Sequence, residues 1–211
     1  MTGWDDGITW HLELVTGPDF AEDTLQIDDV RDNHLRGANG TAEDAYIQRL
    51  MRFSYREAER KTWRALLPQT WELVLSDFPT AGDGRIVFDR PPLQSIVSVT
   101  YTDSLGDDQD LAVSPADFQV VTPSGPKAAK GYIVPLYGAS WPSTQVIAEA
   151  VRIRFTAGYP TSDGVVEIPE DLDQARLLLI GEAYKHRSES AALNTPGLIR
   201  AKDIFLEYRA W

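Results

Sequence analysis

The longest stretch of helical periodicity runs from about residue 42 to residue 66. Small and apolar side chains recur there at a spacing of 3.6 residues, which predicts a helix with one face in a core. The predicted core face consists of Ile47, Leu50, Met51, Ser54, Tyr55, Ala58, Thr62 and Ala65. A shorter helix is predicted over about 28–36.

The opposite side of the long helix carries cations among aromatic side chains. Its members are Arg49, Arg52, Arg56, Arg60 and Arg64, interleaved with Tyr46, Phe53 and Trp63. A solvated face needs no aromatic side chains, so two interpretations remain open. The face either lies beneath the protein's own β region or forms a protein interface, where arginine and aromatic residues are enriched.

The period changes from 3.6 to 2 after Pro68, which predicts strands separated by turn-rich links. These strands cover 69–75, 85–88, 94–101, 117–121, 131–135 and 151–159, and an earlier stretch at 11–18 also alternates. Short strands with tight links predict an antiparallel β region over about 69–158 and an α+β fold class.

Helical periodicity resumes at Pro169, a favoured first helical residue. The run 172–184 is apolar around most of its circumference, which predicts a central, buried helix. The last segment, about 198–210, spreads its apolar residues around nearly the whole helix. We expect another chain to cover this aromatic ending, because an exposed apolar chain end is unfavourable.

The composition removes several classes of function. The 211 residues include no cysteine, which excludes disulfides, thiolate zinc sites and cysteine nucleophiles. The formal net charge of −12 opposes nucleic-acid binding, which needs a basic face. No apolar run reaches the length of a membrane span, and the acidic N-terminus does not resemble a signal peptide. We therefore expect the protein to stay in the cytoplasm where it is made.

The sequence offers little support for catalysis, and we expect no enzyme activity, no metal and no cofactor. His11, His34 and His186 are far apart, and no nucleophile-elbow or phosphate-loop motif occurs. An acidic cluster at 103–110 lacks the order of a calcium loop, so we interpret it as a solvated turn.

A β-rich module that binds carbohydrate is the alternative function. Such modules display aromatic side chains on a sheet, and only Trp141 among the tryptophans is predicted to be available to a ligand. Trp71 alternates with Leu73 and Leu75, which is typical of a core residue.

Several stretches in order resemble the head–tail connector, or adaptor, proteins of long-tailed bacteriophages, prophages and gene transfer agents. They are HLELVTGP, TAEDAYIQRL, AERKTWRALLPQTWELVL, RPPLQSIVSVTYTD, VRIRFTAGYP, IPEDLDQARLLLIGEAYKHR and LEYRAW. The resemblance covers nearly the whole chain and rests on the order and spacing of packing motifs.

The resemblance implies a helical core, about 28–66 and 169–210, with the β region inserted between its two parts. In this division 1–68 holds a strand and two helices of the core, 69–158 the insert, 159–192 the central helix and 193–211 a docking segment. It also implies a ring of about twelve copies beneath a portal protein at one capsid vertex. A head-completion, stopper or tail-terminator protein is the next partner, and double-stranded DNA passes through the channel without sequence-specific binding.

The resemblance also gives roles to particular residues. The portal-docking residues are Ile204, Phe205, Leu206, Tyr208, Arg209 and Trp211. The residues facing the neighbouring subunit are Arg49, Arg52, Phe53, Arg56, Arg60 and Trp63. Made in the bacterial cytoplasm, the protein is expected to enter the virion or virus-like particle at its neck and to contact no membrane.

Overall fold

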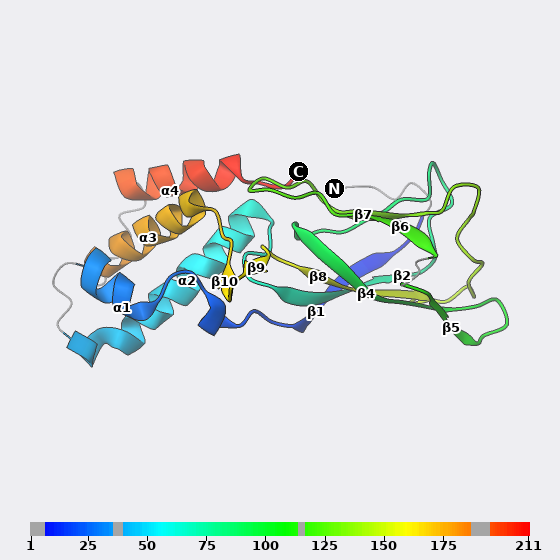
Figure 1. Ribbon diagram of the computed structural model, residues 1–211, viewed down its shortest axis with the longest axis horizontal. Coiled ribbons are helices and arrows are strands. Elements are labelled where there is room, and N and C mark those ends of the chain that lie inside the picture. Colours follow the sequence, from blue (N-terminus) through cyan, green and yellow to red (C-terminus); the bar gives the residue numbers. More distant parts are fainter. Residues whose placement is uncertain (1–6, 36–39, 114–116, 187–194) are drawn as a thin grey trace. The chain divides into compact units, whose positions relative to one another are not determined.

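The computed structural model describes residues 7–35, 40–113, 117–186 and 195–211. The chain forms two compact units, which we call the β unit (1–19 and 68–158) and the helical unit (20–67 and 159–211). Figure 1 shows the helices and strands in chain order, and the predicted α+β fold class is confirmed. The sequence also predicts a turn at 37–41 and a break at 194–197 before the last helix, and residues 37–39 and 194 of these lie outside the described residues.

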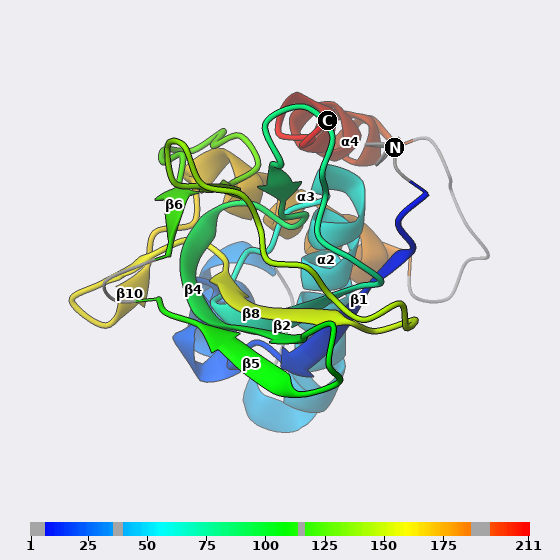
Figure 2. The same cartoon turned by 90° about the vertical axis from the view of Figure 1, so that its right-hand side faces the viewer.

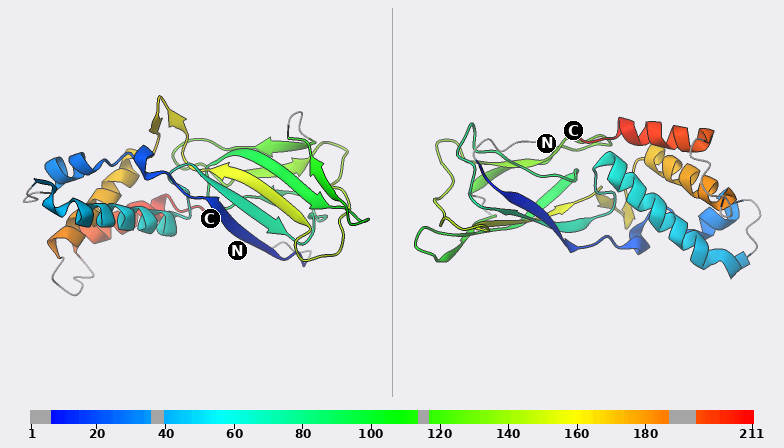
Figure 3. Two further views of the ribbon diagram at one scale, coloured as in Figure 1. Left: turned by 90° about the horizontal axis from the view of Figure 1, so that it is seen from below. Right: turned by 180° about the vertical axis from the view of Figure 1, so that it is seen from behind.

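The β unit contains two antiparallel sheets. The larger sheet has the strand order β1-β2-β8-β4-β5, visible side by side in Figure 3. Its strands are β1 (Trp10–Thr16), β2 (Gln69–Leu75), β8 (Val151–Ala157), β4 (Leu93–Thr102) and β5 (Asp108–Leu111). The smaller sheet consists, in spatial order, of β3 (Ile86–Val87), β7 (Tyr132–Pro135) and β6 (Phe118–Val121).

Strict alternation along β8 explains how the sheets enclose a core. Val151, Ile153 and Phe155 are all buried, and the Phe155 ring centroid lies 4.7 Å from that of Phe88 after β3. Side chains on the other face of β8 are charged, and Arg152 and Arg154 both form ion pairs with Glu72 of β2. One face of β8 is therefore held by burial and the other by charge pairs with β2.

The N-terminal strand belongs to the β unit, which differs from the expected division at residue 68. β1 pairs with β2 in antiparallel register, with Leu12 opposite Leu73. Alternation alone predicts a strand without naming its neighbour, because a strand's partner is set by contacts far away in sequence. The β region at 69–158 therefore takes its edge strand, β1, from residues that precede the long helix in the sequence.

The helical unit is built around α3, which packs against both α2 and α4. Its helices are α1 (Ile27–Asp29), a π-helical turn (Val30–His34), α2 (Asp44–Thr62), α3 (Glu170–Lys185) and α4 (Pro196–Glu207). Short 3₁₀ turns occur at Phe20–Glu22 and Gly40–Glu43. The predicted core face of α2 is buried, apart from Met51, which is partly buried. Among the described residues no helix is both long and apolar enough to cross a membrane.

A small hairpin in the helical unit was absent from the sequence prediction. β9 (Thr161–Ser162) pairs with β10 (Val165–Val166) through a tight turn. Asp163 and Gly164 both have positive φ, at 51° and 79°. An Asp-Gly pair is the residue choice that such two-residue turns favour, so the sequence did carry the signal.

A fully buried arginine lies on α3, where the sequence predicted an apolar circumference. Arg176 donates hydrogen bonds to both carboxylate oxygens of Asp23, at 2.8 and 2.5 Å, and to Asp173 at 2.9 Å. Its guanidinium also lies 5.6 Å from the ring centroid of Tyr55 on α2. Burial raises the pKa of Asp173, although the charge of Arg176 opposes this shift. The network ties the segment before α1 to the centre of the helical unit.

Removing Asp23 should strongly destabilise the helical unit. Asp23→Ala leaves a buried guanidinium without its main partner, and breaking a buried pair costs about 3–5 kcal/mol. Urea unfolding followed by circular dichroism measures this loss. Glu22→Ala removes an exposed acid beside it and should change the free energy of unfolding by less than about 0.5 kcal/mol. Equal stability of the two variants would contradict the role of the buried network.

Candidate interaction surfaces

Two of the C-terminal aromatic residues lie in the protein's own core. Phe205 and Tyr208 are buried in the cluster that also contains Leu172 and Leu179 of α3. The expectation that another chain covers this ending is therefore wrong for these two residues. They alternate with exposed neighbours because α4 covers α3 with one side only, and the sequence could not show which side that is.

The chain beyond α4 is attached to the end of α2 by backbone and side-chain hydrogen bonds. The Ala210 amide donates to the Thr62 carbonyl at 2.8 Å, and Arg64 Nε donates to the Tyr208 carbonyl at 2.6 Å. The Tyr208 hydroxyl donates to Asp171 Oδ2 at 3.2 Å. Burial lowers the pKa of Arg64 and raises that of Tyr208. These bonds fix the direction in which the last residues leave the core.

An exposed aromatic and cationic surface results from this attachment. The Arg209 guanidinium lies 5.1 Å from the ring centroid of Trp63 and 4.6 Å from that of Trp211. Trp63 has a left-handed backbone, with φ of 59°, where α2 ends, and Trp211 is 85% exposed. Leu206, one helical turn before Arg209, is 52% exposed. We call Trp63, Leu206, Arg209 and Trp211 the C-terminal patch.

The remaining side of α4 is also partly apolar. Ile199 is exposed seven residues before Leu206, and this spacing places both on one side of the helix. Ile204 is half-buried against the core. Of the six expected portal-docking residues, the structure therefore leaves Leu206 and Trp211 exposed and Arg209 and Ile204 partly so.

The cationic side of α2 is exposed and forms the second surface. Arg49, Arg52, Arg56 and Arg60 are exposed together with Phe53, and we call these five residues the arginine face. The Arg52 guanidinium lies 5.7 Å from the ring centroid of Phe20, and Arg60 pairs with Glu57. Because these side chains are exposed, the face is not part of the helical unit's own core.

Arg64 differs from the other arginines of the predicted face, because it is buried and attaches the chain end. No sequence signal distinguishes Arg64 from Arg60, because residues four apart in a continuous helix lie on the same face. The distinction arises because α2 ends at Thr62, so Arg64 no longer follows the helical spacing. Trp63, the residue at which the backbone turns, was predicted on this face and is exposed.

Acidic side chains on the helical unit could meet such a face. Glu22, Asp28, Asp29 and Asp32 are exposed in the segment that precedes α2 in the sequence. Arg31 is ion-paired with Asp28 and Asp32 and also with Asp44. One base among several acids leaves this region net negative, and residues 1–34 of the sequence contain nine acids against the single base Arg31.

Trp141 is less free than the sequence predicted, because its ring is packed against the protein, although it also lines an open hollow of about 480 Å³. Its ring stacks on Phe78 with centroids 5.0 Å apart and an interplanar angle of 10°. Its Nε1 donates to the Gly84 carbonyl at 2.6 Å. The indole therefore holds two loops of the β unit together, and the face stacked on Phe78 is not open to a sugar.

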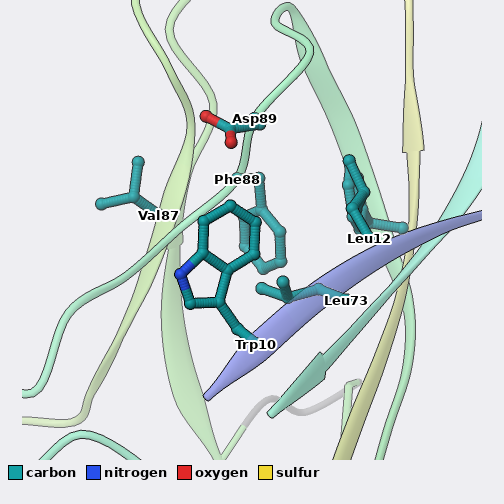
Figure 4. Close-up of a pocket in the computed structure, with 7 residues that line it drawn as sticks. Trp10, Leu12, Leu73, Val87, Phe88 and Asp89 are labelled. Carbon is teal, nitrogen blue, oxygen red and sulfur yellow. The ribbon is translucent and has the colours of Figure 1, made fainter. Parts of the chain in front are cut away.

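A cavity between the two sheets is too small for a sugar. Figure 4 shows Trp10, Leu12 and Leu73 of the larger sheet around it, with Phe88 and Asp89 from the chain after β3. Its volume is about 10 Å³, which is about the space that one water molecule needs. This small cavity beside β1 is therefore a packing defect rather than a binding site.

The acidic cluster is a structured turn. Asp103 Oδ1 accepts hydrogen bonds from the amides of Leu105 and Asp107, at 2.8 and 3.1 Å. These bonds lower the pKa of Asp103. Asp108 and Asp110 lie in β5, which the sequence analysis had assigned to the turn. Within the described residues no group of three or more histidine or acidic side chains is placed to hold a metal ion.

Comparisons with known proteins identify the fold. No protein-family model matches the chain, and a search of curated proteins gave no match. One solved structure is the neck of an empty gene transfer agent (GTA) particle, computed with C6 symmetry. A chain from it is 27% identical to this protein, with a TM-score of 0.73 over 95% of this chain and 96% of that chain. The resemblance to head–tail connectors is confirmed. The likeness spans both the β unit and the helical unit, because it covers nearly all of each chain.

Two further solved structures agree with this resemblance. A chain from the virion of the native gene transfer agent (GTA) particle is 26% identical, with a TM-score of 0.72 over 95% of each chain. A chain from the neck of the native GTA particle, computed with C12 symmetry, has 24% identity and a TM-score of 0.67 over 95% of this chain and 96% of that chain.

Replacement by alanine should affect stability differently at two aromatic residues near the C-terminal end. Phe205→Ala should lower the free energy of unfolding by about 3–5 kcal/mol, because the side chain fills the core. Trp211→Ala should change it by less than about 0.5 kcal/mol, because the ring is exposed. Thermal unfolding of both variants checks this difference. A large loss in Trp211→Ala would show that the last residue belongs to the core.

Proposed function

We propose that this protein is a structural head–tail connector that forms a ring beneath a phage-type portal. The ring extends the DNA channel and links the capsid to the neck and tail. The observation that carries this proposal is the likeness over 95% of the chain to two chains of gene transfer agent particles, one of them from a neck computed with sixfold symmetry. Such a protein is made in the bacterial cytoplasm and enters the particle at its neck.

The C-terminal patch is the surface proposed to dock on the portal. Tryptophan and arginine are the residues that most often contribute large binding energies at interfaces. Stacking between Trp63 and Trp211 restricts the Arg209 side chain before binding, so less conformational entropy is lost on docking. Leu206 and Ile199 extend the apolar area along α4. Phe205 and Tyr208 support the patch from the core beneath.

The arginine face is proposed to meet the neighbouring subunit. A head-to-tail ring brings one surface of each copy against a different surface of the next. The arginine face and the acidic region around Asp28 and Asp32 have opposite charge within one helical unit. Two surfaces of opposite charge on one chain therefore suit a closed ring of identical copies. Phe53 supplies an apolar contact among the cations.

The overall charge suits passage of DNA through the ring. Each copy carries a formal net charge of −12, and a ring of about twelve copies repels phosphates from any surface that lines the channel. Pairing of the arginine face between copies removes its cations from the channel. Double-stranded DNA then passes without sequence-specific binding.

Variants of the C-terminal patch should fail to add to the portal. Leu206→Ser with Trp211→Ala removes two exposed apolar side chains and leaves the core intact. Mixed with the purified portal protein of the same particle, this double variant should bind at least tenfold more weakly than the unaltered chain, by electron microscopy and sedimentation. Val165→Ser, which alters an exposed valine in β10, is the control and should bind normally.

Absence of any complex between the unaltered chain and the portal would refute the connector assignment. Normal binding of the double variant, with normal rings, would leave the connector assignment intact and move the docking surface elsewhere. Point variants are preferred to a truncation here, because removal of α4 also removes the buried Ala201 and Phe205.

Charge reversal on the arginine face should weaken contacts between copies. Arg52→Glu with Arg56→Glu should give incomplete rings on the portal, because cations that face an acidic neighbour become repulsive. Lys127→Glu with Lys185→Glu makes the same change in charge at two other exposed positions and should leave rings complete. Image classification of portal complexes counts the copies. Complete rings in both double variants would remove the arginine face from the subunit interface.

A further inference from the structure

One end of the β unit carries several fully exposed apolar side chains. This end is formed where β2, β4 and β7 finish and β8 begins, and Figure 2 looks onto it. Leu105 in the β4–β5 turn is 85% exposed, and Tyr137 and Val146 in the β7–β8 loop are completely exposed. We call these loops the loop end. Exposed apolar side chains on adjoining loops are a feature of interaction sites rather than of inert surface.

The loops that carry these side chains are held in place. The Gln145 amide donates to the Thr102 carbonyl at 3.0 Å, and Asp103 forms an isolated bridge with Thr144. The Thr144 hydroxyl donates to Asp77 Oδ1 at 2.7 Å, which joins the β7–β8 loop to the end of β2. Loops fixed by such bonds lose little conformational entropy when a partner docks on them.

Two surface hollows adjoin each other at the loop end. One has a volume of about 480 Å³ and lies beside Trp141, and the other has about 460 Å³ and lies beside Val146 and Ile147. Asp77 and Phe78 line both hollows, so an exposed carboxylate stands at the wall between them. A partner can therefore insert side chains on either side of a fixed negative charge.

The charge of the loop end selects the class of partner. The sequence from 103 to 126 contains five aspartates and no lysine or arginine, and 135–151 contains one glutamate and no lysine or arginine. Arg85 and Arg152 lie next to these loops but are ion-paired with Asp83 and Glu149, so acids predominate. An acidic surface repels phosphates, which argues against nucleic acid and against an anionic membrane. It complements a protein surface that carries lysine or arginine.

We propose that the loop end is the docking surface for the next protein of the particle neck. This protein presents a lysine or arginine beside Asp77, and an apolar recess that receives Val146. The proposal rests on the proposed connector function, because a connector needs a second docking surface besides the one for the portal. The C-terminal patch belongs to the helical unit and the loop end to the β unit, so each partner has its own unit of the chain.

Paired variants test the two kinds of contact. Val146→Ser removes an exposed apolar side chain at the loop end, and Val97→Ser makes the same change on β4, where the valine is also exposed. Asp77→Asn removes the charge while its oxygen can still accept the bonds from Phe78 and Thr144. Asp163→Asn, in the β9–β10 turn, is its control.

Each variant replaces the native chain in cells that assemble the particles, and electron micrographs are scored for rings on portals and for tails on heads. Val146→Ser combined with Asp77→Asn should keep its rings but should reduce tail-bearing particles at least tenfold. The combined control, Val97→Ser with Asp163→Asn, should match the unaltered chain in both scores. Pull-down of the neighbouring neck protein by ring-bearing heads, at 50 and 500 mM salt, should show weaker capture at high salt.

The two scores separate the possible failures. Rings without any loss of tails in the loop-end variant overturn the docking proposal while the connector function stands. Equal loss in the control pair also overturns it, because the effect is then not specific to the loop end. Binding of the unaltered chain, but not of Val146→Ser, to phosphatidylcholine vesicles would assign the surface to a membrane instead. Failure of the unaltered chain to form rings on portals would contradict the connector function itself.

Discussion

Attachment of the chain end to the end of α2 decides which apolar side chains the protein buries and which it presents. The hydrogen bonds from Ala210 to Thr62 and from Arg64 to Tyr208 fix the last residues against the helical unit. Phe205 and Tyr208 then face inward, while Leu206 and Trp211 face outward. Without this attachment the same residues form an unstructured apolar tail, and with it they form a defined surface supported by a core.

Periodicity was enough to predict most of the elements, because burial on one face leaves its mark on every strand and helix. The core face of α2 and the strands from β2 to β8 follow from this rule, with β5 as the exception. β5 has Asp108 and Asp110 on one face and Gln109 and Leu111 on the other, so a single apolar residue is too little to mark it as a strand. The place of β1 beside β2 was not predictable, because a strand pattern does not specify a partner more than fifty residues away.

The candidate surfaces were predicted less well than the fold, and the reasons are physical. Residue types indicated an arginine face and an aromatic ending, and both are present. Sequence could not show that Arg64 and Phe205 turn inward, because packing sets both where α2 ends and which side of α4 covers α3. The buried Arg176 is a similar case, since its partner Asp23 lies far away in the sequence. The loop end depends on exposure, which only the folded chain reveals.

The chain passes between its two units three times, after residues 19, 67 and 158. This connectivity sets the order in which the protein can be completed during synthesis. β1 leaves the ribosome first but must wait for β2 and then for β8, and the helical unit cannot close until α4 follows. Both units therefore reach their final form only when nearly the whole chain is available. A product cut short by premature termination lacks α4 and the residues after it, and so cannot present the C-terminal patch.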